Sequence, residues 1–406
     1  MGGRHHVKSS IVLGAGLQGV SVALALAKAG HRVTIVDRAP RALSRASLRN
    51  EGKIHLGFVY AHDETGRTAS LMLDAALKFG PLMDEWLGVP VPWARLKSRP
   101  FSYGLLRDSI APDEEVLTSW ERLNDRYRHR APGEHYLGEA PDHLWASVEP
   151  TSLLTERVRR VVRTAEVSID TYAFRALVCA RLETAADVRR LMDHEIVSVA
   201  RTSHGFRVEG TRRDGTAWHE SADTVVNCLW EGRLLLDRQM GLLPSRPWVY
   251  RLKYRVLGSL PPALLAMPSL TLMLGRFGDI VNYGDGRMYA SWYPACLQGW
   301  SSDVQAPDSW LAASEDGADT AAHRTIVRET MTALDDIVPG FAQSTVSSVA
   351  AGVIFSWGRT DIDDLDSELH ARHDIGPVAH DGYITVNTGK FTTAPLFARQ
   401  VVEMVR

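Results

Sequence analysis

Hydrophobic and polar positions at the start of the chain follow two different periods in succession. Ser10–Leu13 is a short apolar run, as expected for a buried parallel strand. After a glycine-rich stretch, apolar residues recur at the spacing of one helix face, at Leu17, Val20, Leu24 and Ala27. Arg32–Val36 is a second apolar run. The pattern over residues 9–38 therefore predicts a strand, a glycine turn, a helix and a second strand.

The same reasoning predicts further elements along the chain. We expect helices over Arg67–Leu87, over Thr171–Ala185 with Asp170 as cap, and around Ile326–Ile337. Strands are expected at Val188–Leu191, Ile196–Arg201, Phe206–Glu209 and Thr224–Leu229. More strands are expected between 248 and 294, with turns at Gly278–Asp279 and Gly284–Gly286. Residues 300–320 suggest a polar, acidic loop, residues 382–406 a strand, turn and helix, and residues 90–165 no clear element.

The order of these elements indicates an α/β protein whose nucleotide-binding domain is discontinuous. Residues 1–90, 165–240 and 345–406 are expected to form that domain, and residues 91–164 and 241–344 an inserted substrate domain. Residues 248–294 hold several strands without intervening helices, so the sheet of the inserted domain should be mixed or antiparallel.

Composition narrows the function classes. The 406 residues include 46 Lys and Arg against 48 Asp and Glu, a net charge of −2, which argues against a nucleic-acid partner. The three cysteines are far apart and form no C-x-x-C pair, so we expect neither a disulfide framework nor a metal site.

The N-terminus also allows an alternative interpretation. Basic residues such as Arg4 and Lys8 precede a mostly apolar run over residues 11–27, which resembles an export signal or a short membrane span. The glycines and Gln18 in the first half of that run fit neither alternative. We therefore expect a cytoplasmic protein without a membrane span.

Gly14, Gly16 and Gly19 have the G-x-G-x-x-G spacing of a dinucleotide-binding turn. In such a turn the glycines permit a tight bend, close approach of the backbone to a pyrophosphate, and packing of helix on strand. The N–H groups at the helix N-terminus favour the diphosphate charge. Asp37 closes the second strand, where a carboxylate accepts hydrogen bonds from a ribose diol.

Three further motifs accompany this fingerprint. Ser44-Arg45-Ala46-Ser47 is followed by Asn50–Tyr60, which contains an Ile-His-x-Gly-x-x-Tyr core; Val225–Leu229 reads VVNCL, and residues 388–393 read TGKFTT. Together these motifs resemble the flavoprotein superfamily of D-amino-acid oxidase, glycine oxidase and glycerol-3-phosphate dehydrogenase. The first core and the last motif look most like the glycerol-phosphate enzymes.

The resemblance implies a Rossmann-like FAD-binding domain, with FAD rather than NAD bound extended across it, and an inserted α+β substrate domain. The cofactor-binding residues that it and the fingerprint predict are Gly14, Gly16, Leu17, Gln18, Gly19, Asp37, Arg38, Arg45, Ser47, Asn50, Gly52, Lys53, Ile196, Asn227, Cys228, Leu229, Gly389, Lys390, Phe391 and Thr392.

The chain also departs from the superfamily pattern. The usual Asn-Ala-Ala-Gly becomes Asn-Cys-Leu-Trp-Glu-Gly over residues 227–232, which puts bulk where small residues pass the flavin. Val59 replaces an arginine of the glycerol-phosphate enzymes, and Ile354 stands where many members carry a substrate-binding arginine. Arg372 matches one family arginine before the last strand.

Candidate catalytic residues come from the motifs and from the inserted sheet. Lys390, Tyr60 and His55 lie in segments that relatives bring to the flavin ring, although His55 could instead hydrogen-bond the backbone. In residues 250–255, period-2 alternation puts Arg251, Lys253 and Arg255 on one face and Tyr250 and Tyr254 on the other. The basic face could bind an anionic substrate or be solvated, and the tyrosines could line a pocket or pack in the core. Some relatives tether FAD through a cysteine in this half, where Cys296 lies.

We expect an FAD-dependent oxidoreductase that removes hydride from a CH–NH or CH–OH group of a small polar metabolite. Oxygen or another electron acceptor would then reoxidise the flavin. Two alternatives stay open: a polyol or hydroxy-acid dehydrogenase that passes electrons to a carrier, and a non-catalytic FAD-binding protein.

Overall fold

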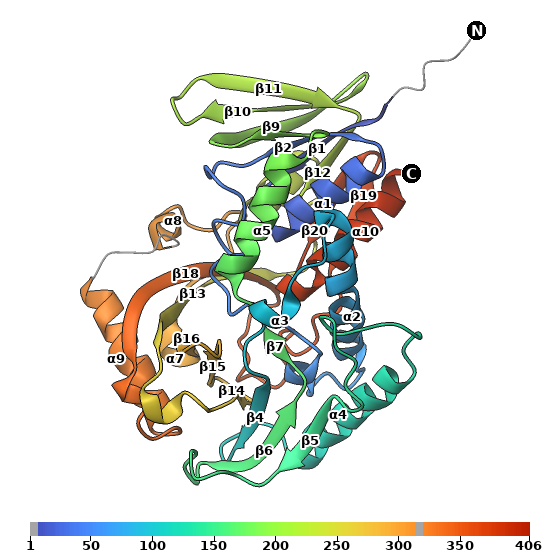
Figure 1. Cartoon of the computed structure of the whole chain (residues 1–406). Helices are drawn as coiled ribbons and strands as arrows, with labels where there is room; N and C mark the ends of the chain where they lie inside the picture. Colours follow the sequence, from blue (N-terminus) through green and yellow to red (C-terminus); the bar gives the residue numbers. More distant parts are fainter. Residues whose placement is uncertain (1–6, 314–319) are drawn as a thin grey trace.

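The fold is that of a computed structural model, which describes residues 7–313 and 320–406. Arg4 of the basic N-terminal segment and positions 314–319 of the expected acidic loop lie outside the described residues. A six-stranded sheet and a three-stranded sheet form the upper part of the molecule, and a nine-stranded sheet forms the lower part (Figure 1).

The six-stranded sheet is built around the first predicted strand. Its order is β19 (Gly376–His380), β20 (Tyr383–Asn387), β12 (Thr224–Asn227), β1 (Ser9–Leu13), β2 (Arg32–Val36) and β8 (Val188–Leu191). All neighbours are parallel except β19 and β20. The side chains of Ile11, Val12 and Leu13 are buried, because both faces of this sheet are covered.

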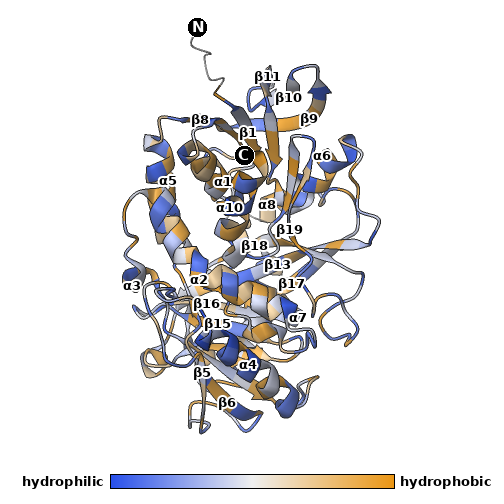
Figure 2. Ribbon diagram, turned by 90° about the vertical axis from the view of Figure 1, so that its right-hand side faces the viewer, coloured by the Kyte–Doolittle hydropathy of each residue, from blue (hydrophilic) through white to orange (hydrophobic). Residues whose placement is uncertain are grey.

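Helices cover one face of this sheet and a second sheet covers the other. The helices are α1 (Leu17–Lys28), α2 (Arg67–Leu87), α5 (Thr171–Thr184) and α10 (Ala394–Val405). The second sheet is antiparallel and consists of β9 (His194–Thr202), β10 (Gly205–Arg212) and β11 (Ala217–Ala222). Phe206, Val208 and Trp218 of that sheet pack with Ile11 and Leu13 of β1. Along α2 hydrophobic and hydrophilic residues alternate, as expected for a helix with one buried face (Figure 2).

The nine-stranded sheet is mixed. Its order is β17 (Leu297–Ser301), β13 (Trp248–Ser259), β16 (Arg287–Trp292), β15 (Gly278–Asn282), β14 (Ser269–Met273), β4 (Phe101–Leu106), β6 (Val158–Thr164) and β5 (Trp145–Val148). β18 (Thr345–Trp357) pairs with β13 along the length of both strands, and only β4 and β14 are parallel neighbours. One side of the sheet packs against α9 (Ala321–Asp335) through Met331 and Leu334.

Short elements connect these parts. β3 (Lys53–Ile54) pairs with β7 (Val167–Ser168). The remaining helices are α3 (Trp93–Leu96), α4 (Asp113–Arg128), α6 (Arg233–Gln239), α7 (Tyr293–Cys296) and α8 (Ser309–Ala313). Single 3-10 turns lie at Phe58–Tyr60, Trp230–Gly232, Pro262–Leu264, Phe341–Gln343 and Phe391–Thr393. No helix within residues 7–313 and 320–406 is long and apolar enough to cross a lipid bilayer.

The predicted fold class is confirmed, with parallel and mixed sheets as expected. One predicted turn is wrong, because Gly278 and Asp279 begin β15 instead. Gly278 is required there by the neighbouring strand, since a Cβ on it would lie 2.2 Å from the Ser291 carbonyl oxygen. The expected loop over residues 300–320 contains α8, and the unassigned stretch 90–165 contains α4 and three strands.

The segment 345–406, predicted as one piece of the nucleotide domain, is divided between two sheets. β18 pairs with β13 in the nine-stranded sheet, whereas β19 and β20 belong to the six-stranded sheet. This pairing favours assigning 345–357 to the inserted domain. The domain boundaries themselves stay a prediction.

Candidate active site

A cavity of about 300 Å³ is lined by loops that follow strands of the six-stranded sheet and by residues of the nine-stranded sheet. One end is formed by the glycine turn after β1 and by Asp37 after β2. The other end is formed by Lys253 of β13, Ile354 of β18 and the segment Thr388–Phe391. The loop that precedes β3 lines it as well, so segments from both ends and the middle of the sequence meet at one site.

The glycine turn is shaped by close contacts. A Cβ on Gly19 would lie 1.8 Å from the Gly14 carbonyl oxygen, so only glycine lets α1 pack against the turn. Gly14 itself has a φ of +94°, a conformation that favours glycine. Gly16 lines the cavity as the N-cap residue of α1, the first turn carries no acidic residue, and the Leu17 N–H donates to the Ser47 hydroxyl at 2.9 Å. The positive end of the helix dipole therefore faces the cavity, as a diphosphate requires.

Asp37 is held at the cavity wall by two backbone donors. Its carboxylate accepts hydrogen bonds from the N–H of Ala15 at 2.6 Å and from the N–H of Ala39 at 2.7 Å. Burial raises the pKa of Asp37, the two backbone N–H groups oppose that rise, and the negative charge of Glu231 adds to it. This is the environment in which a carboxylate gains from ribose hydroxyl donors.

Glu231 is a cavity residue that the sequence did not single out as a ligand. Its carboxylate lies 2.5 Å from the Arg45 guanidinium and 3.7 Å from that of Arg38. Burial raises the pKa of Glu231. In the sequence, Glu231 was indicated only by the difference from the superfamily motif at residues 227–232. In the structure, Trp230 of this segment has a φ of +55°, which is uncommon for a non-glycine residue.

Sixteen of the predicted cofactor-binding residues line the cavity and four do not. The sixteen are Gly14, Gly16, Leu17, Gln18, Asp37, Arg38, Arg45, Ser47, Asn50, Lys53, Ile196, Cys228, Leu229, Gly389, Lys390 and Phe391. The other four shape the wall from behind. Gly19 and Gly52 pack against backbone carbonyl oxygens, Asn227 donates to the Tyr383 hydroxyl at 2.8 Å, and the Thr392 hydroxyl accepts the His55 N–H.

These residues fit a dinucleotide. The cavity combines a glycine cradle, the N-terminus of α1, a carboxylate at the strand end and the arginines Arg38 and Arg45. Two buried polar atoms at its wall, Oε1 of Gln18 and Nδ1 of His55, have no hydrogen-bond partner among the described residues. Polar ligand atoms would satisfy them.

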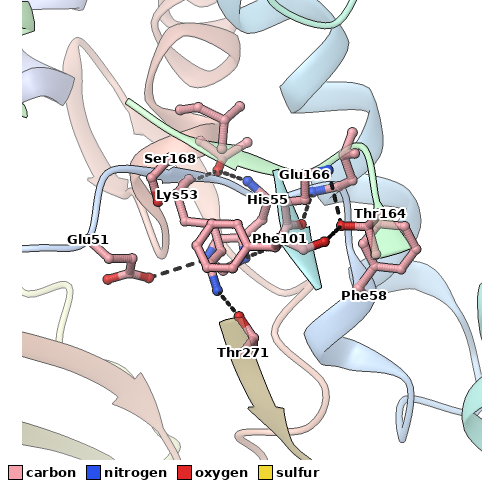
Figure 3. A network of polar contacts seen from close by, with 12 residues as sticks. Glu51, Lys53, His55, Phe58, Phe101, Thr164, Glu166, Ser168 and Thr271 are labelled. Atoms are coloured by element: carbon pink, nitrogen blue, oxygen red, sulfur yellow. Dashed lines mark hydrogen bonds and ion pairs between the residues drawn. The ribbon is translucent and has the colours of Figure 1, made fainter. Parts of the chain in front are cut away.

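His55 lies in a buried polar network with residues from three segments (Figure 3). Its Nδ1 lies 3.9 Å from Glu166, and its Nε2 lies 3.8 Å from Glu51. Burial lowers the pKa of His55 well below its ordinary value, and the positive charges of Lys390, Lys53 and Arg372 lower it further. The imidazole is therefore uncharged at neutral pH.

Glu166 holds the loop that carries His55. It accepts hydrogen bonds from the N–H of Leu56 at 2.6 Å and from the Tyr103 hydroxyl. Burial raises the pKa of Glu166, whereas the charge of Lys53 and these hydrogen bonds oppose the rise. No sequence motif indicated Glu166, because it enters the network from β6–β7, far along the chain.

Lys53 was predicted to bind the cofactor, but its ammonium has protein partners. It donates to the Thr271 hydroxyl at 2.6 Å and to Asp279 at 2.9 Å, and it lies 4.0 Å from the ring centroid of Phe101. Burial alone would lower the pKa of Lys53, but the negative charges of Asp279, Glu166 and Glu51 raise it. Lys53 is thus a charged half of a buried ion pair.

Lys390 and Tyr60 lie together, as the two motifs suggested. The Lys390 ammonium lies 5.8 Å from the ring centroid of Tyr60. Lys390 lines the cavity, whereas Tyr60 is buried behind it. Arg372 also lines the cavity, and its guanidinium donates to the Phe355 carbonyl oxygen at 2.7 Å.

The basic strand 250–255 divides between cavity and interior. Lys253 and Tyr254 line the cavity, and Tyr250 packs in the core with Phe355. Arg251 is buried and donates to Tyr293, Ser356 and Asp361 at 2.8–3.1 Å, so its guanidinium is already paired. The geometry gives no support to the predicted substrate role of Arg251, nor to the expectation of a solvated basic face.

Cys296 is buried, and its Sγ lies 3.4 Å from the Thr330 hydroxyl. Burial raises the pKa of its thiol, and Cys296 is not among the residues that line the cavity. It is therefore poorly placed to tether a flavin.

Comparisons with known proteins place this site in context. A D-amino acid dehydrogenase from Agrobacterium fabrum is 37% identical over 82 residues, which is 20% of this chain and 20% of that protein. The match thus spans about a fifth of the relative's length.

Solved structures show the same fold over nearly the whole chain. A glycine oxidase from Geobacillus kaustophilus superposes with a TM-score of 0.66 at 15% identity, covering 98% of this chain and 95% of that one. A glycerol-3-phosphate dehydrogenase from Bacillus halodurans, solved with FAD, gives a TM-score of 0.57 at 14% identity, covering 99% and 64%. The family described as FAD dependent oxidoreductase (DAO) matches residues 10–404. The chain therefore belongs to the family of FAD-dependent oxidoreductases, and its cofactor is FAD.

Proposed function

We propose that this enzyme oxidises the CH–NH bond of a small amino acid. The α-carbon would give up a hydride to FAD, and the resulting imine would hydrolyse to a keto acid and ammonia. Family membership and the matched segment of D-amino acid dehydrogenases support this activity. The observation that carries it is the position of His55 in the cavity, beside Glu51.

An amino acid reaches the site with a protonated amine, and that proton must leave before the nitrogen lone pair can assist hydride loss. His55 lines the cavity, and its Nε2 lies 3.8 Å from Glu51, which lines the cavity as well. A neutral imidazole in this position can accept the proton directly or through one water. Glu51 and Glu166, each about 4 Å away, would stabilise the imidazolium that forms.

The substrate carboxylate has cationic partners nearby, although Ile354 replaces the usual arginine. Arg372 and Lys390 line the cavity, and their charges reach His55. A carboxylate bound by either would place the adjacent amine within reach of the imidazole. Charge-assisted hydrogen bonds of this kind are among the stronger polar contacts in proteins.

Oxidation of a CH–OH bond is a second candidate. A neutral imidazole is also the base that an alcohol requires, and the TGKFTT segment resembles the glycerol-phosphate enzymes. The two candidates share His55 and differ in the group that it deprotonates.

Anaerobic stopped-flow reduction of the bound flavin distinguishes them. We expect bleaching by D- or L-amino acids, and slowing by about 10²–10⁴-fold in His55→Gln with FAD still bound. His204→Gln, at an exposed position outside the cavity, is the matched control. Reduction by 2-hydroxy acids alone would favour the second candidate, and reduction by neither class would favour a non-catalytic flavoprotein.

The electron acceptor is proposed to be oxygen or a separate carrier, and comparing reoxidation in air with reoxidation by a quinone or dye decides between them. The cytoplasmic location stays a prediction, which fractionation of expressing cells tests.

A further inference from the structure

Three cations line one end of the cavity without a carboxylate partner among the described residues: Lys253, Arg372 and Lys390. Lys253 lies over the ring of Tyr293 at 5.4 Å, and Lys390 lies over that of Tyr60 at 5.8 Å. The guanidinium of Arg372 donates to the backbone carbonyl oxygens of Phe355 and Gly389.

The carboxylates around this end are mostly engaged elsewhere. Asp279 is bound by Lys53, and Asp361 by Arg251 and Tyr293. Glu51 and Asp308 line the cavity as well; Glu51 lies 3.8 Å from His55, and Asp308 accepts a hydrogen bond from Gln305. Lys253, Arg372 and Lys390 thus have no ion pair among the described residues, and this end of the cavity holds three cations that an anionic ligand can neutralise.

An ordinary amino acid does not pair with all three cations. Its single carboxylate occupies Arg372 or Lys390, and its amine loses a proton to His55 under the proposed function. Lys253 is partly buried and then has no ion-pair partner among the described residues, so an anion that binds beside it would compensate its charge. Lys253 reaches the cavity from β13, opposite Gly352 of β18, so it approaches from a different element than the other two cations.

We propose that the substrate carries a second anionic group, carboxylate or phosphate in character, and that Lys253 selects it. This inference rests on the proposed function for the role of the first carboxylate. Tyr289 and Ile354 also line the cavity, and their low polarity strengthens an ion pair formed there.

Binding of unreactive acids tests the proposal without any turnover. Perturbation of the flavin spectrum of the holoenzyme is titrated with butyrate, succinate and 3-phosphonopropionate. We expect at least one dianion to bind about tenfold or more tightly than butyrate, as one added charge-assisted contact implies. Lys253→Met should reduce that advantage to about twofold or less, and Lys253→Arg should retain most of it.

Lys78→Met, at an exposed position of α2, removes the same charge elsewhere and should keep the full ratio. Equal affinities of the two dianions and butyrate for the unaltered protein would overturn the proposal, and so would a ratio that Lys253→Met leaves intact. These binding affinities are measured without catalysis. Failure of all amino acids to reduce the flavin would refute the proposed function alone, whereas turnover with no preference for aspartate over asparagine would refute the second anionic group alone.

Discussion

Replacing Lys53 with methionine tests whether its ammonium serves the protein or the cofactor. The Lys53 side chain is 1% exposed and pairs at 2.9 Å with Asp279, whose side chain is 19% exposed, so the substitution leaves a largely buried carboxylate without its counter-ion. Removing one partner of a buried ion pair costs about 3–5 kcal/mol. We expect the lower end, about 3 kcal/mol, because the Thr271 hydroxyl still donates to Asp279 and Lys253 is nearby. Urea unfolding with saturating FAD, followed by tryptophan fluorescence, measures the loss.

Two comparisons make this reasoning refutable. Lys28→Met removes a surface ion pair with Glu85 whose side chains are 55% and 37% exposed, and it should cost at most about 1 kcal/mol. The double variant Lys53→Met/Asp279→Asn removes both charges and should recover about 2 kcal/mol of the loss. A cost for Lys53→Met equal to that for Lys28→Met, or a double variant no more stable than the single one, would contradict the assignment. Loss of FAD affinity in both Lys53 variants would indicate a cofactor role instead.

Three further outcomes are expected. Gly19→Ala should yield protein with little flavin, measured as absorbance at 450 nm relative to 280 nm, because its Cβ would lie 1.8 Å from the Gly14 carbonyl oxygen. Gly30→Ala strains a backbone with a φ of +89° but meets open space, so this control should lose some stability and keep the flavin. Glu231→Gln should lower the Kd for FAD about three- to tenfold, since it releases Arg45 to a phosphate, and an unchanged Kd by fluorescence titration would contradict this. The pKa of His55 is lower in the folded than in the unfolded protein, so the unfolded chain takes up the proton first as the pH falls. The contribution of the neutral imidazole to the free energy of unfolding is therefore present above about pH 6.5 and is lost below it. Between pH 6.5 and 5 the free energy of unfolding of the wild type should fall by up to about 1.4 kcal/mol per pH unit more than that of His55→Gln.

Local patterns in the sequence predicted those elements whose stability is local. The helix over Arg67–Leu87 has one apolar face, and the structure gives it the same bounds. Asp170 caps the next predicted helix, accepting hydrogen bonds from the N–H groups of Tyr172 and Ala173. The fingerprint from Gly14 to Asp37 is likewise a short-range unit, since it needs only one turn between two adjacent strands.

The pattern of hydrophobic and polar residues did not predict which distant segments pair with each other. Alternation placed Arg251, Lys253 and Arg255 on one face, which suggested a common role. The structure instead pairs Arg251 with Asp361 and Arg255 with the Leu48 carbonyl oxygen, contacts separated by 110 and 207 positions in the chain. Gly278 shows the same limit, because its need for glycine comes from the neighbouring strand and resembles a turn signal in the sequence.

Two lysines of the same cavity show why pairing decides function here. Lys53 and Lys253 both line it, and both carry a positive charge in surroundings of low polarity. Asp279 neutralises the charge of Lys53 and the Thr271 hydroxyl accepts a hydrogen bond from it, so Lys53 links β3 to the nine-stranded sheet. Lys253 has no such partner among the described residues, and the free energy of leaving it unpaired is available to a ligand that brings the missing charge. The sequence identifies both as basic residues near a flavin site, and only the map of ion pairs separates the structural cation from the one that can recognise a substrate.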